Sequence, residues 1–447
     1  MTFTIISCAT NHSGYACYSN GDYACAYAEW MPFASNGHPQ AQYNISLLYD
    51  GGLGVKEDAA EAAKWLRKSA IQDYTEAQYN LGSLYEKGRG VKQDYAEALK
   101  WFRRAAKHNL VQAQHNIGVL YYKGRGVELD YIEAEKWFRK ASEQGYSESR
   151  YNLGIMYNKG QGVTQNVVEA VKWFREAATQ GNLGAQFNLG VLYANGNGVK
   201  QDSVESEKWY RKAAEQGEAE AQFNLGVIYS DGEGVEPDAT ESLKWYRRAA
   251  EQGYIDALSN IGLMYSKGKG VKQDYVEGVK WFRKAAEKGD AAAQFNLGIS
   301  YAYGEGVEPN GSEAAKWLRK AADQGERKAQ YNLGVRYAKG NGVKRDFSEA
   351  WKWYRKACSN EQADRCVALK NIIENEASKI FVVVPANGSG LKLGMKITSE
   401  NMQIRKLNSG DLPDDYITPD RFSEIEGRTV NKNIGEGVAI GLSDVSP

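Results

Sequence analysis

The residues best suited to do chemistry in this 447-residue chain are side-chain amides at a fixed spacing. Asparagine recurs every 36 residues, and we call this set the asparagine ladder: Asn44, Asn80, Asn116, Asn152, Asn188, Asn224, Asn260, Asn296 and Asn332. A side-chain amide offers two N–H donors and a carbonyl acceptor, so a row of amides can hydrogen-bond a ligand. Asparagine is a mediocre helix former. If this position of the 36-residue repeat is helical, its presence in all nine units requires a reason.

Sequence patterns for catalysis and metal binding are missing. Four histidines occur, and His108 and His115, which flank one turn, have no pattern of Cys or carboxylates around them that would form a metal site. The nine Gly-x-Gly-Val loops join helix to helix and lack the preceding strand and the Lys-Ser/Thr of a nucleotide-binding turn. We therefore expect a non-enzymatic protein with no catalytic residue, no metal and no other cofactor.

The charge balance and the hydropathy of the chain argue against a nucleic-acid partner and against a transmembrane segment. Lys plus Arg number 56 and Asp plus Glu number 56, so no basic excess favours nucleic acid. No run of 18 apolar residues is present, so the sequence predicts no transmembrane segment.

The sequence pattern of each 36-residue unit predicts two helices, and the ladder asparagines are on the first of them. In residues 77–112, apolar residues at helical spacing form one face: Ala77, Leu81, Leu84 and Tyr85. Gly82 lies on this helix, where glycine costs about 1 kcal/mol relative to alanine. Because glycine fills this position in eight of the nine units, we expect a neighbouring helix to approach too closely for a β-carbon. Gly88 and Gly90 suit the positive φ angles that end the helix.

The second helix is predicted to begin at Asp94, a good N-cap, with Glu97 completing a capping box. It carries one tryptophan per unit, at Trp65, Trp101, Trp137, Trp173, Trp209, Trp245, Trp281, Trp317 and Trp353. We expect each tryptophan to lie in the core. Stacked units of this size form a solenoid with one continuous core, and solenoids generally provide binding surfaces.

The repeat resembles the Sel1-like repeat family, a relative of the tetratricopeptide repeat. The matching segments are residues 77–82, 88–91, 94–98 and 100–103, with their counterparts in the other units. The resemblance implies an α-solenoid, a right-handed superhelix of helix-loop-helix repeats, which mediates protein–protein interaction without catalysis. It also implies that the ladder asparagines face a concave groove and hydrogen-bond the backbone of an extended peptide.

Two interpretations of the asparagine ladder remain open. In the first, the amides bind a protein or an extended peptide segment; in the second, each amide satisfies polar groups of the adjoining repeat. Partner selection is assigned to residues that break the consensus on the first helices: Tyr122, Asp231, Tyr303 and Arg336. A second complete ladder, of arginines from Arg67 onward, is expected to pair with glutamates or to pack its stems on aromatic rings.

The chain is divided into five parts. Residues 1–13 are interpreted as an export or lipoprotein remnant, 14–40 as a degenerate N-terminal capping unit, and 41–364 as nine repeats. Residues 365–377 are expected to form a capping helix and 378–447 a separate domain. In the N-terminal unit, Ala26, Trp30 and Phe33 are predicted to form the buried face of a helix.

The tail resembles the SAF, or antifreeze-like, domain found at the end of sialic acid synthases and in flagellar and pilus assembly proteins. Residues 380–384 predict a buried strand, and the resemblance is carried by residues 394–401, 404–405, 417–419, 425–428 and 433–437. It implies a small β-rich C-terminal domain. The alternative function that follows is binding of a sialic-acid-like carbohydrate, with Lys379 nearest to the usual basic residue, or a role in envelope assembly.

Five cysteines bear on the compartment. Sel1-like relatives place disulfide-bonded cysteines at the registers of Cys358 and Cys366, and Cys17 and Cys25 have the same spacing of eight. The alternative, four small buried thiols, stays open. Residues 5–8 look like a bacterial lipobox with Cys8 as the lipidated residue, although no basic segment precedes them. Disulfides would favour a periplasmic or secreted protein over a cytoplasmic one.

Overall fold

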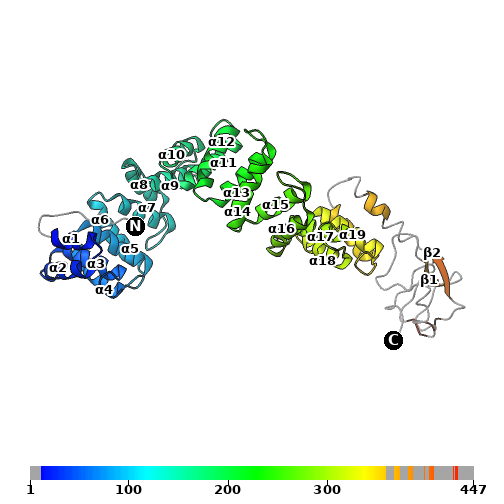
Figure 1. Cartoon of the computed structure of the whole chain (residues 1–447), viewed down its shortest axis with the longest axis horizontal. Helices are drawn as coiled ribbons and strands as arrows, with labels where there is room; N and C mark the ends of the chain where they lie inside the picture. The colour runs from blue at the N-terminus through cyan, green and yellow to red at the C-terminus, as the bar shows by residue number, and fades with distance from the viewer. Residues whose placement is uncertain are drawn as a thin grey trace. The chain divides into compact units, whose positions relative to one another are not determined.

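The computed structural model describes residues 12–358, 367–372, 381–385, 397, 402–406, 426 and 428–430. Residues 12–358 form twenty helices, which confirms an all-helical repeat solenoid (Figure 1). The helices divide into two compact units, the first holding residues 1–221 with 233–235 and the second holding 222–232 with the residues from 236 onward. The part of the chain that the structure describes contains no helix that is long and apolar enough to cross a bilayer.

The first unit is built from twelve helices, most of them 13 residues long. They are α1 (His12–Ser19), α2 (Tyr23–Ser35), α3 (Pro39–Gly51), α4 (Ala59–Ala70), α5 (Thr75–Lys87), α6 (Tyr95–Lys107), α7 (Val111–Lys123), α8 (Tyr131–Glu143), α9 (Ser147–Lys159), α10 (Val167–Thr179), α11 (Leu183–Asn195) and α12 (Ser203–Glu215). Each helix packs against the next along the chain.

The boundary between the units falls within α13 (Ala219–Asp231). The second unit continues with α14 (Ala239–Glu251), α15 (Ile255–Lys267), α16 (Tyr275–Glu287), α17 (Ala291–Tyr303), α18 (Gly311–Asp323), α19 (Arg327–Lys339) and α20 (Phe347–Ala357). Residues 367–372, inside the range expected for a capping helix, are helical, and Leu369 is fully buried against Phe347 and Ala350. This short segment thus covers the core of the last repeat.

The helix-loop-helix unit has the local structure that its sequence predicts. Gly88, whose φ of 70° is left-handed, is the C-cap of α5. Asp94 is the N-cap of α6, and its carboxylate accepts the Ala96 and Glu97 backbone N–H groups. The capping box is only half formed, because the Glu97 side chain bonds Lys100 instead of returning to Asp94. The glutamate at this position therefore supports its own helix surface.

Close packing between the two helices of a unit explains why glycine recurs at the position of Gly82. A β-carbon placed on Gly82 would lie 2.7 Å from the ring of Phe102, which is fully buried on the second helix of the same unit. This confirms the expected close approach. The tryptophans follow the prediction less uniformly: Trp245 and Trp353 are buried, whereas Trp137, Trp173 and Trp281 are half-buried.

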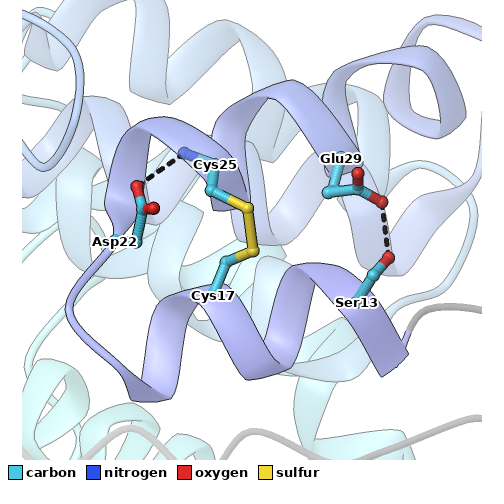
Figure 2. The surroundings of a disulfide bond; sticks show 5 residues. All are labelled: Ser13, Cys17, Asp22, Cys25 and Glu29. Atoms are coloured by element: carbon cyan, nitrogen blue, oxygen red, sulfur yellow. Dashed lines mark hydrogen bonds between the residues drawn. A yellow bond between two sulfur atoms is a disulfide. The ribbon is translucent and has the colours of Figure 1, made fainter.

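The N-terminal unit is a helix pair joined by a disulfide. Cys17 on α1 and Cys25 on α2 are bonded, with their Cα atoms 5.7 Å apart, and the Asp22 carboxylate caps α2 through the Cys25 N–H (Figure 2). Ala26 and Trp30 are buried as predicted, but Phe33 is 42 % exposed and Ala34 takes the buried place. Positions 26, 30 and 34 are four residues apart and share one helix face, which position 33 leaves.

Two short strands occur beyond the repeats. β1 (Phe381–Pro385) pairs antiparallel with β2 (Met402–Lys406), with Phe381 opposite Lys406. Ile397, from one of the segments that resemble the SAF domain, is buried and its N–H donates to the Arg428 carbonyl at 2.9 Å. Lys379 and most of the other residues that carry that resemblance lie outside the described residues.

Candidate functional site

All nine residues of the asparagine ladder lie on the first helix of their pair. Asn44 is 2 % exposed, and the other eight are half-buried. Helices α9 and α11, the first helices of adjacent repeats, contact each other, so Asn152 and Asn188 lie on neighbouring helices. A half-buried amide keeps part of its polar surface in contact with solvent.

Several ladder amides bond the preceding helix pair. The Nδ2 atoms of Asn44 and Asn80 donate to the hydroxyls of Tyr15 and Tyr43 at 3.1 and 3.3 Å. Burial raises the pKa of the Tyr246 phenol to about 12, with the carboxylate of Asp231 adding to this and a hydrogen bond from Asn260 opposing it. These contacts match the interpretation in which the amides satisfy groups of the adjoining repeat.

Other ladder amides bond their own helix or no protein group. Asn188 and Asn332 donate to the carbonyls of Gly184 and Lys328, at 2.7 and 2.8 Å, and Asn188 also bonds the Tyr151 hydroxyl. Within residues 12–358, four ladder amides form no side-chain hydrogen bond, and we call them the open asparagines: Asn116, Asn152, Asn224 and Asn296. The ladder thus contains two populations that the sequence does not distinguish.

Two of the bonded amides contact the residue 37 positions earlier, in the preceding repeat. Asn80 and Asn188 meet a tyrosine there, whereas the equivalent residues for Asn152, Asn224 and Asn296 are His115, Phe187 and Ser259, which lack a phenol. Asn116 follows Tyr79 and still forms no bond, and the contacts of Tyr79 give no reason for this.

The four proposed specificity residues fall into two classes. Asp231 and Tyr303 are exposed, and the side chain of Tyr303 is 71 % accessible. Tyr122 is packed against Tyr131 and donates to Gln161 at 2.7 Å, and Arg336 donates to the Asn341 carbonyl at 3.0 Å. Asp231 and Tyr303 are therefore accessible to a partner, whereas Tyr122 and Arg336 are hydrogen-bonded to other residues of the protein.

The arginine ladder is engaged within the protein, by a partner that the sequence reasoning missed. Among the described residues, the guanidinium donates to the hydroxyl of a tyrosine 18 residues later in the pairs Arg67–Tyr85, Arg103–Tyr121, Arg139–Tyr157, Arg175–Tyr193, Arg247–Tyr265, Arg283–Tyr301 and Arg319–Tyr337. The expected pairing with glutamate is found for Arg139, Arg211 and Arg319. The sequence contains a complete arginine ladder and a complete tyrosine ladder offset by 18 residues, and this spacing could have indicated the pairing.

Glutamine side chains connect successive repeats, which was also missed. The glutamine two positions before a ladder asparagine accepts from a glutamine 30 residues later, in the pairs Gln72–Gln42, Gln144–Gln114, Gln216–Gln186, Gln252–Gln222 and Gln324–Gln294, at 2.7 to 2.9 Å. We call these pairs the glutamine relay. Gln42, Gln186 and Gln294 also donate to the carbonyl eight residues earlier, as Gln186 does to Ala178. The relay thus satisfies buried polar groups at these five junctions.

The cysteines outside the N-terminal unit are partly described. Cys358 is disulfide-bonded, whereas Cys366 and Cys8 lie outside the described residues. Within the described residues, no group of three or more His, Cys, Asp or Glu side chains is arranged to hold a metal ion.

His115 is the histidine whose environment is most altered. Burial lowers its pKa to about 4, with the Lys123 charge adding to this effect and Glu148 opposing it, and Nδ1 lies 2.9 Å from the Ser149 hydroxyl. Its ring packs beside Phe138 and Tyr146. His115 is therefore neutral in the folded protein at pH values where it is protonated in the unfolded chain.

We expect this histidine to make the first unit less stable in mild acid. The folded pKa is depressed, so its effect is absent above about pH 6.5 and destabilisation grows as the pH falls towards 4; linkage gives a loss of about 2 kcal/mol at pH 5. The test compares melting temperatures at pH 7 and pH 5 for the wild type and His115→Phe, since Phe223 fills the same position in another repeat. Equal pH dependence in the two proteins would contradict the assignment.

Comparison with known proteins places the repeats in a family. Nine segments match the Sel1 repeat: residues 39–74, 75–110, 111–146, 147–182, 184–218, 219–254, 255–290, 291–326 and 327–361. The number of units equals the nine predicted, and eight of the nine matches begin two residues before the predicted frame. No curated protein matches the sequence.

Two of the solved structures that are similar to this chain are more than 30% identical to it over the aligned residues. One is a protective antigen present in uropathogenic Escherichia coli strains that displays an SLR fold; it is 37% identical over 82% of this chain and 87% of its own, with a TM-score of 0.57. The other is a Sel1 repeat protein from Oxalobacter formigenes, 34% identical over 69% of this chain and 90% of its own, with a TM-score of 0.54. Sel1 repeat proteins are generally protein-interaction scaffolds. On the nine repeat matches and these two structures, the chain belongs to the Sel1 repeat family.

Proposed function

We propose that this protein is a non-enzymatic scaffold or adaptor that binds an extended segment of a partner protein along its first helices. One observation carries the proposal: the open asparagines are half-buried, remain in contact with solvent and form no side-chain hydrogen bond in residues 12–358. The family supports the same class of function, because Sel1 repeat proteins are generally interaction scaffolds.

The chemistry of the open asparagines fits a peptide backbone. Each amide offers donors and an acceptor, which complement the alternating C=O and N–H groups of an extended chain. A helix position occupied by a poor helix former with no internal bond has no evident structural benefit. Binding would supply hydrogen bonds that the folded protein alone does not make.

Selectivity is assigned to exposed residues near the same helices. Asp231 and Tyr303 lie at the ends of α13 and α17, at a register occupied by lysine in several other repeats, such as Lys87 and Lys123. An acidic and an aromatic side chain in place of lysine would favour different residues of a partner at these two positions. Recognition is assigned to the repeats instead of residues 378–447, because the family match ends at residue 361.

The test removes open asparagines and compares them with bonded ones. Asn116→Ala with Asn152→Ala should weaken binding of partners captured from the native host about tenfold, at roughly 0.5–1.5 kcal/mol for each hydrogen bond, and leave the melting temperature nearly unchanged. The control, Asn80→Ala with Asn188→Ala, removes bonds within the protein and should lower the melting temperature more than it weakens binding. Unchanged binding by the first variant, or a large loss of its stability, would refute the proposal.

A further inference from the structure

An open pocket lies in the second unit, where the C-terminal ends of α14 and α16 meet the beginning of α15. Its volume is about 410 Å³, within the range usual for small-ligand sites. Leu258 and Trp281 form an apolar floor, Leu258 being 4 % exposed and Trp281 half-buried. Trp281 is held in place because its indole N–H donates to Glu277 at 3.0 Å.

The pocket coincides with an interruption of the glutamine relay. Leu258 occupies the first-helix position of the relay, and Lys288 occupies the position 30 residues later. Leucine has no polar side-chain atom, so neither the bond between the two side chains nor the bond to the carbonyl eight residues earlier can form. At the junctions on either side, Gln252 bonds Gln222 and Gln324 bonds Gln294, both at 2.8 Å. The two positions that bond each other in the five relay pairs are thus both changed at this junction, to an apolar and a cationic residue.

The pocket is separate from the asparagine ladder. Leu258 and Asn260 are two residues apart on α15, which places them about 200° apart around the helix axis, since each residue turns it by about 100°. A ligand in the pocket therefore does not compete with a segment on the ladder face. The inference goes beyond the proposed function and does not depend on it.

Charges of both signs surround the apolar floor. Lys284 and Lys288 lie one turn apart, and Glu251 and Glu287 line the same opening. The Lys284 ammonium lies 4.4 Å from the centre of the Trp281 ring. Among the described residues, none of these four side chains forms an ion pair, whereas Lys280 on the same helix pairs with Glu277. Unpaired charges around an apolar floor complement a ligand that carries both signs.

We propose that this pocket binds one aliphatic or aromatic side chain of a partner protein segment, with an acidic and a basic residue on either side of it. The apolar side chain lies on Leu258 and Trp281. The acidic neighbour meets Lys284 and Lys288, and the basic neighbour meets Glu251 and Glu287. The site adds an anchor point on a second face of the repeats.

The experiment uses the full chain with 15N-labelled tryptophan and capped tripeptides as probes. The peptide Ac-Lys-Leu-Glu-NH2 should produce a saturable shift of the Trp281 indole N–H signal in the millimolar range, and Ac-Lys-Gly-Glu-NH2 should produce none. The double variant Leu258→Gln with Lys288→Gln, which restores the relay, should bind the leucine peptide at least tenfold more weakly.

A second variant keeps the proposal testable if the first does not fold. Lys284→Ala with Lys288→Ala changes two exposed side chains and should weaken binding of Ac-Lys-Leu-Glu-NH2 severalfold. Binding of Ac-Ala-Leu-Ala-NH2 should not change in this variant. The absence of a saturable shift in the wild type, equal shifts with the glycine peptide, or unaltered binding in both variants would each overturn the proposal.

Discussion

Gly126→Ala is expected to destabilise the first unit by about 2–5 kcal/mol, although it adds a single methyl group. Gly126 has a φ of 71°, and a β-carbon there would lie 2.4 Å from the Tyr95 carbonyl carbon and 2.5 Å from the Ala96 nitrogen. These are backbone atoms at the start of α6, so no side chain can move aside. The loop of one repeat or the second helix of the preceding repeat would have to shift.

Gly145→Ala is the matched control for this prediction. Gly145 also has a positive φ, 86°, but a β-carbon there would meet nothing within 4 Å. Gly145→Ala should lower the free energy of unfolding only by the cost of a β-carbon at a positive φ angle, about 1–2 kcal/mol. Urea denaturation followed by circular dichroism measures both, and hydrogen exchange of α6 and α8 shows whether the damage is local. Equal losses in the two variants would contradict the close packing between repeats.

Phe174→Ala is expected to cost about 3–5 kcal/mol, because it removes a buried ring and leaves a cavity. Phe174 on α10 is fully buried, and its ring packs over Gly154, where a β-carbon would lie 2.6 Å from the ring. The glycine brings the two helices so close that little space remains for other side chains to fill the cavity. The loss should appear in the same denaturation experiment.

Val168→Ala on the same helix is the control for Phe174→Ala. Val168 is 56 % exposed, so its truncation should change the free energy of unfolding by no more than about 0.5 kcal/mol. If Phe174→Ala proved equally mild, the buried ring would not be a main source of stability in this repeat.

The sequence predicted the repeat, its two helices and their boundaries with little error. Asp94 and Gly88 act within a few residues of their own positions, so capping and left-handed glycines can be read directly from the order of the residues. The close helix approach at Gly82 was expected from the same periodicity. One error was local too: Phe33 was placed on a face that Ala34 occupies.

The state of each polar side chain was decided only by the tertiary structure. Asn80 and Asn116 stand in nearly identical sequences, yet only Asn80 bonds a tyrosine of the preceding repeat. The arginine–tyrosine bonds likewise join residues 18 positions apart, and the bonds of the glutamine relay join residues 30 positions apart. A repeat pattern determines which residues share a face, whereas a hydrogen bond requires two particular atoms within about 3 Å, and only packing between helices sets that distance.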